Sequence, residues 1–263
     1  NRPIQPLNNR PSAPSATHIT WTYDTNSNLG PTKWGANLDA ACNSDAQSPI
    51  NLLSSAIVNS SLVAIGTAFE LEGACKTYLG EVNDHTWEVG DLHECAEGGK
   101  FKLAWEGTDY IMKQFHFHSP SEHTVDGKHF AMEAHFVFFT EAGETGPVIG
   151  VLLDASTYKN SSAQTWLSQY TFDNEKHSTA NAIDPREFFP TNQQYWHYTG
   201  SYTTPSCKNG IVPWLVLTTP VAISHSYLYT YVAALKDLPQ TYNSMTNNRP
   251  IQDTNGRTVQ KSD

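Results

Sequence analysis

The sequence predicts one mainly β domain with a few short helices. Short apolar runs recur along the chain, several of them alternate with polar residues, and most are bounded by Gly, Asn, Asp or Pro, a pattern typical of strands. Helical periodicity is scarce, and the two candidate helices, Ser162–Tyr170 and Ser224–Lys236, are short. No linker divides the chain after its first segment, so we expect one domain over residues 20–263.

The elements follow from the N-terminus. Residues 1–19 are rich in Pro, Asn and Ser and predict a flexible arm. Trp21 to Trp34 suits an irregular packed segment, and Gln47–Leu52 (QSPINL) a turn that leads into a short strand. The expected strands then lie at residues 62–71, 85–90, 100–107, 109–118, 129–139, 147–153 and 214–223.

The charge balance excludes some partners. The net charge is −10 at pH 7, and the Lys and Arg residues form no cluster. This argues against nucleic acid and against an anionic membrane surface. No apolar run approaches the length that a membrane span needs.

The cysteines and sequons favour a secreted protein. The four cysteines form no CxxC pair, so a cysteine zinc site is disfavoured, and their even number suits two disulfides. Asn59 and Asn160 each begin an Asn-X-Ser sequon that would accept a glycan in a secretory pathway.

The pentapeptide NRPIQ occurs twice, at Asn1–Gln5 and at Asn248–Gln252. Two interpretations are open. The repeat is a coincidence or a local duplication, or both copies fit the same groove and one of them comes from a neighbouring chain in a homodimer.

Three histidines indicate a metal site. His116 and His118 are two residues apart and therefore share one face of a strand. Glu133, His135 and Val137 share one face of the next apolar run. If the two runs pair as antiparallel neighbours, three imidazoles converge, and three imidazoles without a fourth protein ligand describe an open catalytic zinc site. Glu133 can accept the second ring N–H of a ligand histidine.

The motifs FHFH, SEHTVDG and AMEAHFVF (residues 115–118, 121–127 and 131–138) resemble the central zinc motif of α-class carbonic anhydrases of the secreted type. GPTKW, QSPINL, YWHYTGSYTTP, PWLVL and NNRPIQ match that family in the expected order. The resemblance implies a large, twisted, mostly antiparallel central sheet with the zinc at the bottom of a conical cleft. It also implies zinc-dependent, reversible hydration of CO₂ to bicarbonate and a proton by attack of a zinc hydroxide.

The resemblance also assigns roles to individual residues. Thr203 would accept the hydrogen of the zinc hydroxide and donate its own to Glu122, which orients the nucleophile. The implied Zn²⁺ ligands are His116, His118 and His135, supported by Gln114 and Glu133. By contrast, we expect His123 to belong to a structural network with Tyr198 and Ser48.

The same resemblance outlines the substrate pocket and the proton path. His85 would carry the proton out, with Asn83 and Tyr23 ordering the water between. Thr204 and the backbone N–H of Thr203 would contact bicarbonate, and sulfonamide-type or anionic inhibitors are expected at the zinc. The residues implied for the CO₂ pocket are Val137, Val148, Tyr202, Val212 and Trp214. Tyr202 and Glu88 depart from the family, which more often has a smaller apolar residue and an amide there.

Cys42 and Cys207 match the disulfide of secreted family members. Cys75 and Cys95 remain, either bonded to each other across neighbouring strands or free.

Two rival functions are considered. His116, His118 and Glu122 satisfy the cupin-like pattern HxHxxxE, in which the glutamate is itself a ligand of iron or manganese. No second cupin box follows, and the Thr203 segment would be unexplained. The other rival is a non-catalytic binding or storage protein on the same scaffold. All three histidines, Glu122 and Thr203 are intact, which argues against it.

Overall fold

The computed structural model describes residues 20–59, 61–62, 65–155 and 162–263. The main sheet contains β2 (Ile57–Val58), β3 (Phe69–Glu72), β4 (Thr77–Val82), β5 (Trp87–Gly90), β6 (Lys100–Trp105), β7 (Thr108–His118), β10 (Met132–Phe139), β11 (Thr145–Asp154), β12 (Glu175–Ser178), β13 (Tyr195–Gly200), β14 (Val212–Leu217), β15 (Val221–Ala222) and β16 (Gln260–Lys261). A small second sheet contains β1 (Asn51–Leu52), β8 (Thr124–Val125) and β9 (Lys128–His129). The helices are α1 (Trp34–Asn37), α2 (Ile65–Ala68), α3 (Ser162–Leu167) and α4 (His225–Leu235), with 3₁₀ turns at Ala40–Asn43 and Pro185–Glu187.

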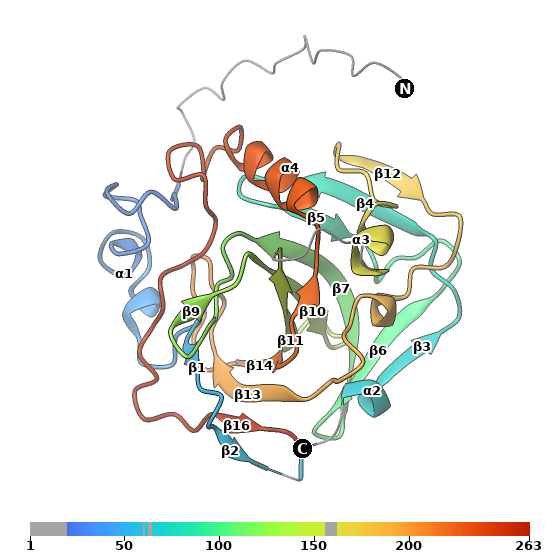
Figure 1. The fold of residues 1–263 in the computed structure, drawn as a ribbon, viewed down its shortest axis with the longest axis horizontal. Helices are drawn as coiled ribbons and strands as arrows, with labels where there is room; N and C mark the ends of the chain where they lie inside the picture. Colours follow the sequence, from blue (N-terminus) through green and yellow to red (C-terminus); the bar gives the residue numbers. More distant parts are fainter. Residues whose placement is uncertain (1–19, 60, 63–64, 156–161) are drawn as a thin grey trace.

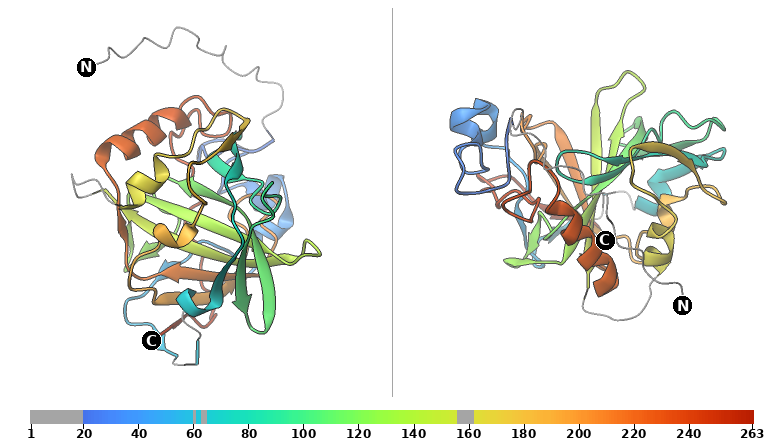
Figure 2. Two further views of the ribbon diagram at one scale, coloured as in Figure 1. Left: turned by 90° about the vertical axis from the view of Figure 1, so that its right-hand side faces the viewer. Right: turned by 90° about the horizontal axis from the view of Figure 1, so that it is seen from above.

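The main sheet runs in the order β12-β4-β5-β7-β10-β11-β14-β13-β16-β2, and β15 and β6–β3 branch from β11 and β7. Most neighbours are antiparallel, whereas β11 pairs with β14 and β15, and β16 with β2, in parallel. Helices α3 and α4 pack on the face of the sheet that carries Phe115 and Phe117, through Trp166 and Tyr231, whereas α1 lies to the side (Figures 1 and 2). The expected mainly β fold with few short helices is confirmed.

The strand alternation separates two packed faces at the centre of the sheet. Phe115 and Phe117 of β7 and Phe136 and Phe138 of β10 all belong to the larger hydrophobic cluster. On the other face, Val137 packs in a second cluster with residues of β11, β13 and β14. Strands β10 and β11 are buried almost throughout because both faces are covered.

Helix α4 is held by a cap at its N-terminus and by buried residues on one face. Its N-cap Ser224 accepts a hydrogen bond from the backbone N–H of Tyr227, which satisfies one of the free donors of the first turn. Tyr231 and Leu235 are buried, four residues apart on one face. The helices expected at 162–170 and 224–236 are present with slightly shorter bounds.

Two expected strands were partly wrong. The run 214–223 is divided between β14 and β15, with residues 218–220 outside both strands. Residues 65–68 of the run 62–71 form the helical turn α2, and the strand starts only at Phe69. Ile65 and Ala68 are both buried and stand three residues apart, which is helical spacing. A short apolar run does not distinguish a strand from a buried helical turn by periodicity. Strands β4, β12 and β13 were not expected, and β12 (EKHS) is largely exposed, so it carries no apolar pattern.

Some expectations fall outside the described residues. These are the N-terminal arm (residues 1–19), the first NRPIQ copy and the sequon at Asn160.

Candidate active site

The pairing of β7 with β10 brings the three histidines together. His135 is the direct antiparallel partner of His116, and His118 lies two residues further along the same face of β7. The ring centroids are 5.0 Å apart for His116 and His118, 5.3 Å for His116 and His135, and 4.6 Å for His118 and His135. One nitrogen from each ring lies within 4.8 Å of the others, so the three could hold a metal ion.

Each of these rings uses its other nitrogen in a hydrogen bond. His116 Nδ1 lies 2.8 Å from Gln114 Oε1, and His135 Nε2 lies 2.9 Å from Glu133 Oε1. His118 Nδ1 lies 2.6 Å from the carbonyl oxygen of Asn247. Because these partners are acceptors, each bonded nitrogen carries the ring hydrogen and the opposite nitrogen keeps its lone pair.

The donor set fits a divalent cation such as Zn²⁺. His118 Nε2 is buried and has no hydrogen-bond partner among the residues that the structure describes, and an unpaired buried acceptor is costly. Burial lowers the pKa of all three histidines, to about 4 for His118, so the rings are neutral as metal ligands must be.

A second group of possible ligands, His123, Glu133 and His135, forms a hydrogen-bond network instead. Glu133 Oε1 lies 2.7 Å from His123 Nδ1, and His123 Nε2 lies 2.7 Å from the Tyr198 hydroxyl. Tyr198 in turn donates to Ser48 Oγ at 2.8 Å. Burial opposes ionisation of Glu133, but the two histidines outweigh it and hold its pKa well below the usual range. Gly150 leaves room for this carboxylate, because a Cβ there would lie 2.9 Å from Glu133 Oε1.

Glu122 lies behind the histidines and is fully buried. Its Oε1 accepts the backbone N–H of Arg249 at 2.8 Å and lies 3.6 Å from His118 Nδ1. Burial raises the pKa of this carboxyl to about 7, and the Thr203 hydroxyl acts as a donor that opposes the rise. Oε2 has no hydrogen-bond partner within the described part of the chain, although Thr203 lies close enough to affect the pKa of this carboxyl.

A cavity of about 340 Å³ opens in front of the histidines. Its wall is apolar on the side of β10, β11 and β14, and it contains five of the six residues expected to contact substrate: Val137, Val148, Tyr202, Thr204 and Trp214. Val212 does not line the cavity but is buried in the same hydrophobic cluster. The Tyr202 hydroxyl pairs with Thr145 Oγ1 at 2.7 Å, so it is held at the cavity wall.

His85 lines the same cavity, but its ring is packed against aromatic residues. Its centroid lies 5.2 Å from Trp21 and 6.2 Å from Tyr23. Burial, together with His118, lowers the pKa of His85 to about 3. Asn83 and Tyr23 are not among the lining residues, and Asn83 Oδ1 instead accepts the backbone N–H of His85 at 3.1 Å.

An acidic pair stands at the cavity wall. Glu88, a lining residue, is the cross-strand partner of both His116 and Glu81. Burial and the neighbouring Glu81 together raise the pKa of Glu88 to about 8. A proton between the two carboxyl groups relieves their repulsion.

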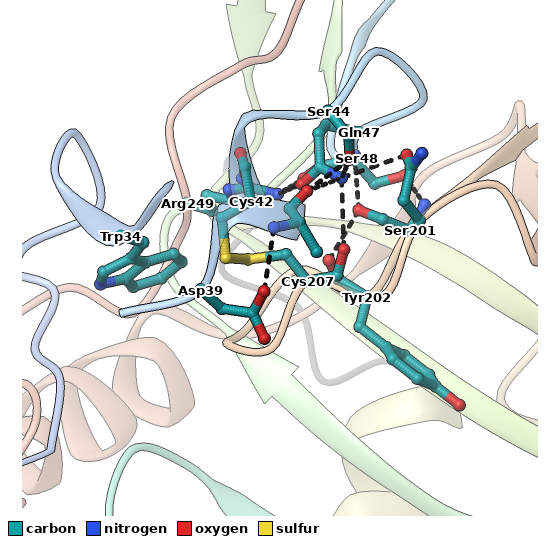
Figure 3. Close-up of a disulfide and its surroundings, with 12 residues drawn as sticks. Trp34, Asp39, Cys42, Ser44, Gln47, Ser48, Ser201, Tyr202, Cys207 and Arg249 are labelled. Carbon is teal, nitrogen blue, oxygen red and sulfur yellow. Dashed lines mark hydrogen bonds between the residues drawn. A yellow bond between two sulfur atoms is a disulfide. The ribbon is translucent and has the colours of Figure 1, made fainter. Parts of the chain in front are cut away.

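The loop that carries Thr203 is tied to the N-terminal part of the domain. Cys42 and Cys207 form a disulfide with a Cα–Cα distance of 4.9 Å (Figure 3). Gln47 Nε2 donates to the carbonyl oxygen of Cys207 at 3.2 Å. Cys75 and Cys95 form a second disulfide, with a Cα–Cα distance of 5.3 Å, so the pairing left open by the sequence is settled.

Two residues of the site were not singled out from the sequence. Asn247 positions His118 through its carbonyl oxygen, and its side chain donates to the carbonyl oxygens of His85 and Phe117 at 2.9 and 2.8 Å. Arg249 holds Glu122. Both lie in the family-matched segment NNRPIQ, but only Arg249 lies within the repeated pentapeptide, so the repeat could have identified Arg249 alone. Lys113 and Phe139, which also line the cavity, gave no such signal.

The fold and the site define a mainly β protein with a cluster of three histidines that could hold a metal ion, beside a partly apolar cavity. The sequence model of the eukaryotic-type carbonic anhydrase family matches residues 29–263. The chain belongs to that family and is an enzyme of the carbonic anhydrase class.

Individual relatives agree. A carbonic anhydrase from Klebsiella pneumoniae is 30% identical over 242 residues, which cover 91% of this chain and 89% of that protein. The α-carbonic anhydrase from Thermovibrio ammonificans, solved with the inhibitor sulfanilamide, has a TM-score of 0.71 and 32% identity, with 91% of this chain and 98% of that chain covered. Dioscorin complexed with ascorbate has a TM-score of 0.72 at 25% identity, with 92% and 97% covered. Dioscorin has this fold but is not named a carbonic anhydrase, so the reaction must be argued from the site residues.

Proposed function

We propose that this protein catalyses the zinc-dependent, reversible hydration of CO₂. The observation that carries the proposal is the convergence of three neutral imidazoles, each with one nitrogen held by an acceptor and the other left for a metal. Zn²⁺ held there would supply Lewis acidity that lowers the pKa of water to about 7, the value characteristic of carbonic anhydrases. The remaining steps depend on the residues of this chain.

Thr203 and Glu122 orient the nucleophile. The backbone N–H of Arg249 occupies Glu122 Oε1, which leaves Oε2 to accept the hydrogen of the Thr203 hydroxyl. Because its own hydrogen is donated to Glu122, the Thr203 oxygen accepts a hydrogen bond from the attacking oxygen. This hydrogen bond orients a lone pair of the attacking oxygen toward the substrate. Zn²⁺ would lower the pKa of Glu122 and favour the carboxylate that this arrangement requires.

CO₂ binds against the apolar wall and bicarbonate against the polar one. Val137, Val148 and Trp214 offer a surface that suits a linear apolar molecule. Thr204 and the backbone N–H of Thr203 stand on the other side, where they would donate to the product anion. Sulfonamides would bind at the same centre, and the Thermovibrio relative was solved in complex with the inhibitor sulfanilamide.

His85 carries the proton to solvent on one of its ring nitrogens. In the described conformation the ring is packed on Trp21 and its pKa is too low for a relay at neutral pH. The ring must therefore leave its contact with Trp21 and become hydrated in the cavity, where water restores its pKa toward 6.5.

Stopped-flow CO₂ hydration at stoichiometric zinc tests the proposal. We expect activity that disappears when zinc is chelated, returns with added zinc, and is inhibited by sulfanilamide. His135→Ala should abolish it while His129→Ala, outside the cluster, should not. A zinc-loaded, folded protein without activity above background would refute the proposal and favour a binding role on this scaffold.

The cupin-like alternative is not supported. Within the described residues, neither group of possible metal ligands includes Glu122, whose Oε1 is taken by a backbone N–H. Metal analysis of the purified protein is the check: iron without zinc would contradict the carbonic anhydrase site.

We also propose that the protein is extracellular. Two disulfides support this location, because cytosolic thiols are kept reduced. None of the helices in the described regions is long and apolar enough to cross a bilayer. At the sequon, Asn59 Oδ1 accepts the Ser61 hydroxyl at 2.7 Å. A mobility shift of the native protein on N-glycosidase treatment, absent in Asn59→Gln, would indicate a glycan at Asn59.

A further inference from the structure

The repeated segment is longer than five residues. Residues 1–10 read NRPIQPLNNR and residues 248–257 read NRPIQDTNGR. Apart from the shared NRPIQ, Asn8 corresponds to Asn255 and Arg10 to Arg257, so seven of the ten positions are identical. The first copy lies outside the described residues, and its role is inferred from what the second copy does.

The second copy closes the active site. Arg249 is only 1% exposed, and its backbone N–H holds Glu122 Oε1 at 2.8 Å. Its guanidinium donates to Gln47 Oε1 at 2.7 Å and to the carbonyl oxygens of Ser48 and Cys42 at 2.8 and 2.9 Å (Figure 3). Two of the three guanidinium nitrogens find acceptors here, and Nε has none among the described residues. A buried guanidinium requires such acceptors, so this arginine fits a groove that supplies them.

The other repeated positions bind the same scaffold. The backbone N–H of Gln252 donates to the Pro49 carbonyl oxygen at 2.8 Å, and the side-chain amide of Asn255 donates to Asp45 O at 2.9 Å. Arg257 donates to the carbonyl oxygens of Gln47 and Thr199 at 2.8 and 3.1 Å. The chain between α4 and β16, which includes this segment, runs past β9 and β1 along one side of the molecule (Figure 1).

The three positions that differ are all exposed. They are Asp253, Thr254 and Gly256, which the first copy replaces with Pro6, Leu7 and Asn9. Gly256 has φ of 76°, and Asn is among the few other residues that tolerate a positive φ. Residue identity is thus retained where the segment binds the scaffold through buried or hydrogen-bonding groups, and residues 1–10 keep what such a groove requires.

The groove of this domain is already filled by its own residues 248–257. In another molecule of this chain the groove would be filled in the same way. We propose that residues 1–10 are the closing segment of a further domain of this same fold, which lies N-terminal to this one in the same polypeptide. Residues 11–19 (PSAPSATHI) have the Pro- and Ser-rich composition of a linker between the two. The proposal rests on the fold and on the contacts of residues 248–257, not on the reaction.

In this arrangement each domain completes its own site. The preceding domain must then contain a segment equivalent to QSPIN, which supplies the acceptors that a buried arginine needs, and a carboxylate equivalent to Glu122.

Sequencing the transcript upstream of the Asn1 codon, from the native source, is the direct test. We expect an open reading frame that contains a QSPI-like segment and the spacing HxH…ExH. An antibody against residues 20–263 should detect a native polypeptide of at least about twice 29.2 kDa before any processing. An initiator methionine and leader directly before Asn1, or an unrelated upstream sequence, would overturn the proposal.

A variant of the present chain tests whether the first copy can serve as a closing segment. Asp253→Pro, Thr254→Leu and Gly256→Asn together convert residues 248–257 into the sequence of residues 1–10. We expect the melting temperature to stay within a few degrees of the parent and the zinc affinity within two-fold. Arg249→Ala, the matched control, should have a lower melting temperature and a weaker zinc affinity than the parent. A triple variant as unstable as Arg249→Ala would show that the first copy cannot fill the groove.

The remaining alternative is that residues 1–10 of one molecule fill the groove of another molecule of the same chain. Size-exclusion chromatography over a range of concentrations distinguishes it. We expect a monomer whose elution is unchanged when residues 1–10 are deleted. A dimer that is lost on that deletion would overturn the proposal in favour of a swapped segment.

Discussion

Each histidine of the metal site presents a particular ring nitrogen because an acceptor holds the other one. For His118 that acceptor is the carbonyl oxygen of Asn247, which is 129 residues away in the chain. For His116 and His135 the acceptors, Gln114 and Glu133, stand two residues away on the same strand face. The local pairs orient two rings within one strand each, whereas the third ring depends on Asn247, from the C-terminal part of the chain.

Removing the Thr203 hydroxyl should slow the reaction without removing the metal. In Thr203→Ala the nucleophile loses its orienting partner, and we expect kcat/KM for CO₂ hydration to fall about 10²-fold, as for loss of a preorganised hydrogen-bonding group. Thr203→Ser keeps a hydroxyl and should retain most of the activity. Stopped-flow rates, normalised to bound zinc, measure both. Equal rates for Ala and Ser would exclude an orienting role.

Removing the His85 imidazole should make turnover depend on buffer. In His85→Ala the proton has no side-chain acceptor on its way out, and we expect kcat at low buffer concentration to fall about ten-fold or more. Added imidazole should restore it. His93→Ala, a histidine outside the cavity, is the control. Unchanged kcat at low buffer would show that His85 is not the relay.

The Glu88–Glu81 pair should make stability depend on pH. Because the pKa of Glu88 is about 8 in the folded protein and near 4.5 when unfolded, the folded state keeps a proton that the unfolded state loses. Stability from this group is therefore complete below about pH 4.5 and falls as the pH rises through about 8. Glu88→Gln removes the effect, so its melting temperature should gain a few degrees on the parent between pH 5 and pH 9.

This comparison is made on zinc-free protein, because a bound cation would lower the Glu88 pKa. Glu144→Gln, at an exposed position, should show no such trend. A difference between Glu88→Gln and parent that is constant with pH would contradict the raised pKa.

At the scale of elements, β13 must pass close to the segment that precedes β1. A Cβ on Gly200 would collide with Ser48 Oγ and would lie 2.7 Å from the Tyr198 ring. This close approach lets Ser48 accept the Tyr198 hydroxyl, which in turn supports His123 and Glu133.

Gly200→Ala should therefore destabilise the protein by about 1–3 kcal/mol, the usual cost of overpacking a buried site. Thr199→Ala, at the exposed neighbouring position of the same strand, is the control and should change stability by less than about 0.5 kcal/mol. Urea unfolding followed by tryptophan fluorescence measures both. If the two variants are equally stable, the close approach is not a constraint.

At the scale of the whole molecule, the two disulfides should contribute unequally. Cys42–Cys207 spans 165 residues and Cys75–Cys95 spans 20. In the chain-entropy model the first is worth about 5 kcal/mol at most and the second about 3 kcal/mol. Replacing each pair with serine and measuring denaturant unfolding gives the two values.

The longer bridge should also affect catalysis. Cys42→Ser with Cys207→Ser frees the loop that carries Thr203, so its CO₂ hydration rate should fall, while the Cys75–Cys95 replacement should leave the rate unchanged. A larger loss of stability for the Cys75–Cys95 replacement would contradict the loop-length argument.

Most of the sheet could be predicted from the sequence, because alternation within a strand is a local property. The two faces of β7 and β10 followed from the period of two in FHFH and MEAHFVF. The helical turn α2 could not be distinguished from a strand, and β12 carries too little apolar character to be recognised. These elements are selected by their neighbours in the sheet, not by their own residues.

The sequence by itself determined the metal-binding face: the spacing of His116, His118 and His135 on two apolar runs, with Glu133 beside them. Only the tertiary structure decided how that face is completed. Asn247 and Arg249 come from the far end of the chain to fix His118 and Glu122, and the packing of His85 on Trp21 sets its low pKa. Strand periodicity specifies which side chains share a face, whereas contacts across more than a hundred residues exist only once the whole chain has packed.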